Sequence, residues 1–399
     1  MTEAAEFDLV LKGGHVIDER NGVNGLADVA IRHGKIAKVS PDIDAGRSAT
    51  RDVSGCYVTP GLIDLHTHVY HKATSLSVDP DMIARRSAVT TLVDAGSAGA
   101  GNYDGFRDFV MAQSRYRIVA FLNISFPGIF GFDKGLVLGE ARLAEMLPVD
   151  RCVAKIEANR DRIVGVKVRI GGPVTGDLGL GALELALEAA NQVDLPLMTH
   201  IGGPPPSYAD VVDMLRPGDI LTHCYRPEPN SAITENGDIL PEILAARERG
   251  VLFDIAHGMG AFGYHTADAA LRHDFKPDVI SSDVHVVCVD GPAYDLLHTM
   301  SKIMNCGMTA EDVIVRATNR PALAMGRPDL GHLGAGAVAD ISVLRMDQAD
   351  VTFADVRGIE RQGDRLFQPV AVYLAGKEGE LSRRPFEEHA LKMQPCRPV

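Results

Sequence analysis

The sequence of 399 residues has no run of about 18 uncharged apolar residues, which argues against a membrane-spanning helix. Its first residues, 1–7, have neither the basic nor the apolar region of a secretory signal peptide. Its six cysteines show no C-x-x-C spacing, which argues against a cysteine zinc site. We therefore expect a cytoplasmic protein with reduced thiols and no membrane partner.

Positive charge is also scarce. Forty Lys and Arg against 53 Asp and Glu give a formal net charge of −13, and such a surface repels nucleic acid and anionic lipid. Hydrophobic residues (46%) and charged residues (23%) are in globular proportion, which argues against disorder. At about 150 residues per domain, the length allows two or three domains or one large barrel.

Short apolar segments alternate with helical periodicity through the middle of the chain. The eight predicted strands span residues 62–66, 88–94, 118–125, 164–170, 195–200, 219–223, 251–256 and 279–283. The clearest helices are predicted at 180–191 and 239–249. This order predicts an α/β fold, a (β/α)₈ TIM barrel over residues 60–330. A doubly wound sheet would usually show a Gly-rich turn after its first strand, where this sequence has histidines.

Both ends of the chain are rich in β-forming residues. Strands are predicted at 7–11 and 15–17 around a Gly13-Gly14 turn, and a hairpin at 27–39 around His33-Gly34. Further β-rich segments occur at 335–344 and 370–374. We expect one small composite β-domain, sandwich-like, made of residues 1–59 and 331–377. Residues 378–399 are predicted to be a loosely held C-terminal tail.

Histidines end the first predicted strand. His66 and His68 share one face of that strand, so they can converge on one ion. Four more polar residues lie in or at the ends of other strands: Lys167, His200, His223 and Asp283. In a barrel all six point into one bowl. Each has a structural alternative, such as a hydrogen-bonded histidine, a snorkelling lysine or a helix-capping aspartate, but together they predict a metal site.

The segment Pro60-Gly61-Leu62-Ile63-Asp64-Leu65-His66-Thr67-His68 resembles the opening signature of the amidohydrolase superfamily. Gly334, Gly336, Ala339 and Asp340 resemble that family's return into its β-domain. Segments 165–169 and 282–285 resemble deacetylases related to dihydroorotases and D-aminoacylases.

The resemblance implies two divalent metal ions, zinc first among the candidates. It places His66 and His68 on one ion and His200 and His223 on the other. Lys167, as an N-carboxylated lysine, would bridge them. Asp283 would bind one metal and act as the catalytic base.

Substrate contacts are expected from loops at the barrel mouth. Arg169 shares the inward face of Lys167, and Arg226 follows His223. Either can bind a substrate carboxylate, or pair with an acidic residue of the protein. His71, His257 and His285 are further candidates for contacts to the substrate or the metal group.

The resemblance implies a hydrolase that removes an acyl group, foremost acetyl, from N-acetyl amino acids or O-acetyl 2-hydroxy acids. The expected partner is thus a small acylated carboxylate. One alternative is a cyclic amidohydrolase that opens a dihydroorotate- or hydantoin-like ring, and another is a non-catalytic scaffold. A homo-oligomer is compatible with the sequence, although no interface can be read from it.

Overall fold

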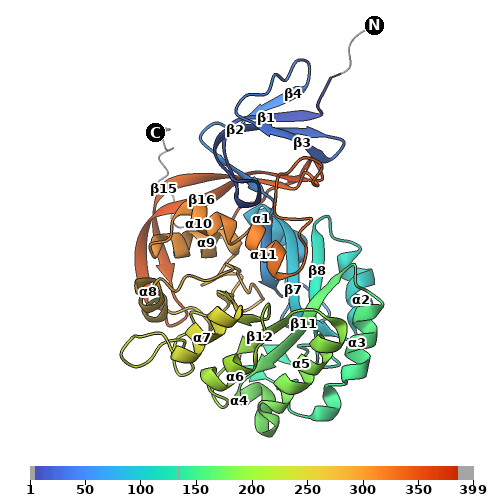
Figure 1. Ribbon diagram of the computed structural model, residues 1–399, viewed down its shortest axis with the longest axis vertical. Coiled ribbons are helices and arrows are strands. Elements are labelled where there is room, and N and C mark those ends of the chain that lie inside the picture. The colour runs from blue at the N-terminus through green and yellow to red at the C-terminus, as the bar shows by residue number, and fades with distance from the viewer. Residues whose placement is uncertain (1–4, 134, 385–399) are drawn as a thin grey trace.

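The computed structural model describes residues 5–133 and 135–384. Seven parallel strands form one curled sheet in which strands consecutive along the barrel are neighbours (Figure 1). In order they are β6 (Leu62–Thr67), β7 (Val89–Gly99), β8 (Arg117–Asn123), β11 (Ile163–Ile170), β12 (Leu197–Ile201), β13 (Ile220–Thr222) and β14 (Leu252–Asp254). The first seven predicted barrel strands are therefore confirmed, with ends shifted by a few residues.

The eighth predicted strand, 279–283, is not a continuous strand. Val279 bridges Asp254 of β14, and Val284 bridges Thr67 of β6, both in parallel. This segment therefore joins the two edges of the sheet and completes the TIM barrel. It is irregular because Asp283 adopts a left-handed backbone, with φ 48°, which interrupts the ladder.

Helices surround the barrel strands (Figure 1). They include α1 (Pro80–Ser87), α2 (Tyr103–Phe106), α3 (Val149–Glu157), α4 (Gly172–Thr175), α5 (Gly181–Val193), α6 (Tyr208–Met214), α7 (Pro241–Arg249), α8 (Tyr264–Arg272), α9 (Leu296–Asn305), α10 (Ala310–Val315) and α11 (Asn319–Ala324). The predicted helices at 180–191 and 239–249 are α5 and α7. In α5, small buried residues such as Ala182, Ala186 and Ala189 let the helix pack closely on β11. Within the described ranges, no helix is long and apolar enough to cross a membrane.

A second sheet combines strands from both ends of the chain, at one end of the molecule (Figure 1). Its order is β17 (Lys377–Glu378), β16 (Glu360–Leu374), β15 (Ile341–Ala354), β5 (Tyr57–Pro60), β1 (Leu9–Asp18), β2 (Val23–Arg32) and β3 (Lys35–Ser40), with β4 (Ala49–Asp52) paired to β1. Antiparallel pairing of β5 with β15 joins the two ends of the chain. The division into residues 1–59 with 331–377 and 60–330 remains a prediction.

One local prediction near the start of the chain was wrong. Gly13-Gly14 is not a turn, because β1 continues through it with a bulge between Leu11 and Gly14. Gly13 has φ +74°, the backbone that such a bulge requires. Of the β-rich segments predicted near the C-terminus, 341–344 and 370–374 are strand, within the much longer hairpin β15–β16, whereas 335–340 precede it. The hairpin around His33-Gly34 is confirmed.

The described part of the predicted C-terminal tail is firmly held. β17 pairs with β16, and the fully buried guanidinium of Arg384 lies 2.7 Å from a carboxylate oxygen of Asp295. A buried ion pair fixes this segment against the start of α9, so it is not loosely held there. Residues 385–399 lie outside the described residues.

Candidate active site

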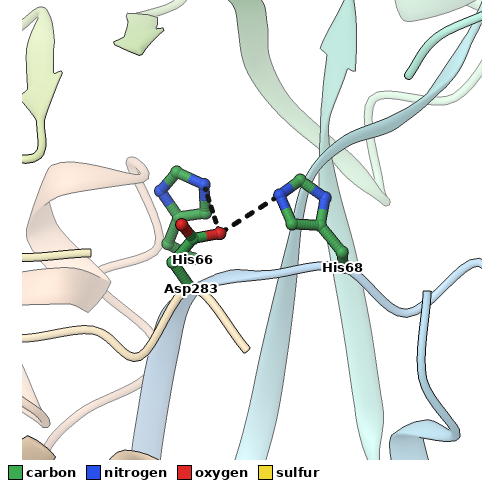
Figure 2. Close-up of side chains that lie close together, drawn as sticks. All are labelled: His66, His68 and Asp283. Atoms are coloured by element: carbon green, nitrogen blue, oxygen red, sulfur yellow. Dashed lines mark ion pairs between the residues drawn. The ribbon is translucent and has the colours of Figure 1, made fainter. Parts of the chain in front are cut away.

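Three buried side chains meet where β6 ends. Nε2 of His66 lies 3.4 Å, and Nε2 of His68 3.3 Å, from Oδ1 of Asp283 (Figure 2). One donor atom from each residue lies within 4.8 Å of the other two, so the group could hold a metal ion. The alternation of a strand brings both histidines to one side, as the sequence predicted.

The other three predicted residues lie beside this group. Nζ of Lys167, on β11, is 3.4 Å from Nε2 of His66. Nε2 of His223 is 2.7 Å from Nδ1 of His200, and the rings of His66 and His223 are 5.4 Å apart. All six residues therefore form one cluster at the carboxyl ends of the strands, and only His200 is partly exposed.

Asp283 is held toward the histidines by residues to which the sequence analysis assigned no role. Asp64 accepts hydrogen bonds from the backbone N and the hydroxyl of Ser282, at 2.9 and 2.5 Å. These two hydrogen bonds hold the segment just before Asp283 against β6. A Cβ on Gly258 would come within 2.2 Å of Oδ2 of Asp283, so a glycine is needed beside the carboxylate.

Space for Lys167 also depends on a glycine. Gly96, on β7, has φ +85°, and a Cβ there would lie 2.6 Å from Cγ of Lys167. Any larger residue would push the lysine stem out of its place. The Gly within Asp94-Ala95-Gly96 is the signal that could have indicated this close packing.

The outer nitrogens of two histidines are already engaged. Nδ1 of His68 lies 2.9 Å from the hydroxyl of Ser97, and Nδ1 of His223 donates to the carbonyl of Ala256 at 2.8 Å. These contacts orient the rings so that Nε2 of each faces the cluster.

Burial sets the charge state of the group. It lowers the pKa of His66, His200 and His223 well below the ordinary value, and that of His68 to about 3, so the imidazoles are neutral and can donate lone pairs. It also raises the pKa of Asp283 to about 6. These donors fit a divalent metal, and the buried Nδ1 of His66 has no hydrogen-bond partner in the described part of the chain.

The two candidate arginines differ in their surroundings. Arg169 is paired, with Nη1 3.4 Å from Oε1 of Glu140, and its guanidinium lies 5.3 Å from the ring centre of Phe132. Phe132 begins the short strand β9 (Phe132–Asp133), which pairs with β10 (Leu136–Val137) in the loop after β8. The sequence analysis missed Phe132 and Glu140. Arg226, in contrast, has no ion pair with any described residue, and its buried Nε has no hydrogen-bond partner.

The three candidate histidines outside the cluster lie in different places. The ring of His285 is 6.1 Å from that of His68 and 5.8 Å from that of Phe132, at the wall of the site. Both ring nitrogens of the buried His257 are engaged, by the carbonyl of Gly258 and by Nζ of Lys302. His71 lines a separate cavity of about 740 Å³ between α1 and the π-helical turn Arg107–Met111. The structure brings His285, but neither His257 nor His71, to the cluster.

A model described as "Amidohydrolase family" matches residues 57–366. The chain belongs to the amidohydrolase family. A protein named deacetylase from Brucella anthropi is 34% identical over 339 residues, which cover 85% of this chain and 84% of that protein. Among solved structures, an adenine deaminase has a TM-score of 0.87 and 30% identity, covering 94% of this chain and 100% of its own. A dihydroorotase has a TM-score of 0.85 and 32% identity, covering 94% and 98%.

Membership of the amidohydrolase family agrees with the site. Family members are typically hydrolases that depend on two metal ions, and this chain presents a buried His-His-Asp group that could bind one. A second pair of histidines lies directly beside that group.

Proposed function

We propose that this amidohydrolase is a metal-dependent deacetylase that acts on small N-acetyl amino acids or O-acetyl 2-hydroxy acids. The observation that carries the proposal is the single cluster formed by its four histidines, one lysine and one aspartate. The deacetylase from Brucella anthropi, similar over most of both chains, supports the reaction type.

The cluster suits two metal ions. His66 and His68 would hold one, His200 and His223 the other, and Asp283 would contribute an oxygen. Two dications bound there, zinc being the foremost candidate, would bring the pKa of a bound water toward 7 and polarise the scissile carbonyl.

Lys167 would complete the group as a carbamate. Burial lowers the pKa of Lys167 to about 7, so much of the amine is uncharged at neutral pH. An uncharged amine can add to carbon dioxide, which forms an N–C bond and releases one proton. The product is an anion with two oxygens, able to bridge two cations that an ammonium would repel.

Asp283 would move the proton in this reaction. Its carboxylate lies between His66 and His68, and with a pKa raised to about 6 by burial it is charged at neutral pH yet basic enough to accept a proton. Oδ1 would take the proton of the attacking water and pass it to the leaving amine or alcohol.

Arg226 is the better candidate for the substrate carboxylate. Its backbone N donates to the carbonyl of His223 at 3.0 Å, which places it at the edge of the cluster. Its guanidinium lacks an anionic partner among the described residues, whereas Arg169 already has Glu140. The buried hydroxyl of Tyr208 also has no hydrogen-bond partner within residues 5–133 and 135–384. A carboxylate bound by Arg226 would satisfy a charge that the protein leaves unpaired.

Ring opening of a cyclic amide is the second candidate. The dihydroorotase with a TM-score of 0.85 favours it, because the same metal group can attack a ring carbonyl. A non-catalytic scaffold is expected to have lost some of the six residues, and this chain retains all of them.

Metal content measured alongside a substrate panel tests these alternatives. The panel holds N-acetyl amino acids, O-acetyl 2-hydroxy acids, dihydroorotate, hydantoins and adenine. We expect about two metals per chain and turnover of acetylated carboxylates. Turnover confined to dihydroorotate or the hydantoins would replace deacetylation by ring opening, and turnover confined to adenine would replace it by deamination. A metal-free, inactive protein would favour the scaffold.

A further inference from the structure

Asp254 is a buried carboxylate that the proposed catalysis does not use. It ends β14, and its Oδ1 accepts a hydrogen bond from the hydroxyl of Ser281 at 2.7 Å. Its Oδ2 lies 3.7 Å from Nδ1 of His66. Neither of these two atoms has a hydrogen-bond partner among the described residues. Two unsatisfied polar atoms that face each other inside a protein indicate a contact that shortens in another state of the site.

The surroundings of Nε2, the other ring nitrogen of His66, determine which of the two nitrogens carries the proton. Nε2 is 3.4 Å from Oδ1 of Asp283 (Figure 2). It is also 3.4 Å from Nζ of Lys167, so it faces the proposed metal group. A nitrogen that binds a metal needs a free lone pair. The proton of the neutral ring therefore lies on Nδ1, directed at Asp254.

We propose that Asp254 is a positioning residue, which accepts a hydrogen bond from Nδ1 of His66 and so holds Nε2 toward the metal. The proposal rests on the metal-binding part of the proposed function. It requires the 3.7 Å gap to close to about 2.9 Å, the usual length of such a bond. Nδ1 of His68 and of His223 already have such partners, in Ser97 and Ala256. Asp254 supplies the corresponding partner for His66.

Metal affinity provides the first test, because it needs no substrate. The affinity for Co²⁺ alone is measured by competition with a chelator in the full-length protein and in Asp254→Ala and Asp254→Asn. Loss of a hydrogen bond to a metal-binding histidine typically weakens metal binding about 10–100-fold, which we expect for Asp254→Ala. Asp254→Asn retains an oxygen and the shape, so its loss is smaller.

Asp219→Asn is the matched control. Asp219 is equally buried, but it lies just before β13, at the end away from His223, and accepts hydrogen bonds from Leu197 and Arg216. Its substitution should lower stability without changing the affinity for Co²⁺. An Asp254→Ala protein that binds Co²⁺ as tightly as this control would overturn the proposal.

Proton NMR of the Co²⁺-loaded protein gives a second readout. In the parent, the proton on Nδ1 of His66 should give an exchangeable, strongly shifted signal. In Asp254→Ala this signal should be lost through exchange with solvent, and in Asp254→Asn its chemical shift should change. If Asp254→Ala does not fold, an unmoved signal in Asp254→Asn overturns the role by itself. A parent protein that binds no Co²⁺ would overturn the proposed function, and this role with it.

Discussion

The guanidinium of Arg169 lies 3.4 Å from both carboxylate oxygens of Glu140, and both side chains are buried. Arg169, which lies on the same strand as Lys167, is therefore already paired with a carboxylate of the protein. Arg226, in the loop after β13, is not reached by any described carboxylate. The two arginines therefore have different expected roles, although each follows a proposed metal-binding residue in the sequence.

Arg226→Met should lower kcat/KM for N-acetyl amino acids by a factor equivalent to about 2–5 kcal/mol of transition-state stabilisation, the range for removing one partner of a buried charge pair. It should change kcat/KM far less for the methyl esters of the same compounds, which carry no carboxylate. Arg169→Met is the control, because it leaves Glu140 without its ion-pair partner and should lower kcat/KM for acids and esters alike. Steady-state kinetics on acid and ester pairs measure the difference. Equal losses for acids and esters in Arg226→Met would show that Arg226 is structural.

Most of the cluster was predictable because it depends on periodicity. Residues two apart on a strand share a face, and the carboxyl ends of barrel strands meet, so His66, His68 and Lys167 could be placed together from the sequence. Glu140 and Phe132 could not, because the loop after β8 has no periodic pattern that fixes where its side chains point.

The path of the chain after a strand was the other feature that could not be predicted from the sequence. His223 comes directly after β13 and His257 three residues after β14, and both looked like site residues. Ala256 has φ 40°, a left-handed backbone that redirects the next residue, and His257 meets Lys302 instead of the cluster. Such a turn in a non-glycine residue depends on tertiary packing, which local propensity does not predict.

Asp283→Asn should retain the fold and much of the metal but lose about 10²–10⁴-fold in kcat, the usual contribution of a general acid–base group. The amide keeps the shape of the side chain and cannot carry the proton. Metal content by mass spectrometry and kcat should be measured on the same sample. A kcat within a few-fold of the parent would mean that another group is the base.

Lys167→Ala should lose at least one metal and nearly all activity, because no anion would then separate the two cations. Formate, acetate or propionate can place two oxygens in the emptied space, and we expect partial return of both metal and turnover. Native mass spectrometry of the parent should show the added mass of one carbon dioxide. An unmodified lysine in a fully active protein with two metals would rule out the carbamate.

Arg384→Met should lower the free energy of unfolding by about 3–5 kcal/mol, the typical effect of leaving one charge of a buried ion pair without its partner. Asp295, its partner, also accepts a hydrogen bond from the backbone of His298 and so caps α9. Arg383→Met, one residue earlier and exposed, is the control and should change stability little. Urea unfolding of both variants measures the difference. Similar midpoints would mean that the ion pair between Arg384 and Asp295 contributes no net stability.

Lys302 should make stability rise with pH. Its ammonium is buried against Nε2 of His257 and the carbonyls of Pro292 and Ala354, and burial lowers the pKa of Lys302 from 10.5 to about 7. Between these two values the unfolded chain holds a proton that the folded protein has released, so the free energy of unfolding increases with pH, by up to about 1.4 kcal/mol per pH unit. Lys302→Met removes this term.

The free energy of unfolding of the parent, relative to that of Lys302→Met, should therefore grow from pH 7 to pH 9.5 in urea titrations. Taking the difference cancels the other groups that titrate in this range. Lys38→Met, at an exposed position on β3, should show no such trend relative to the parent. If the difference for Lys302→Met is flat, the three acceptors around Nζ hold the ammonium charged throughout, and their hydrogen bonds outweigh its burial.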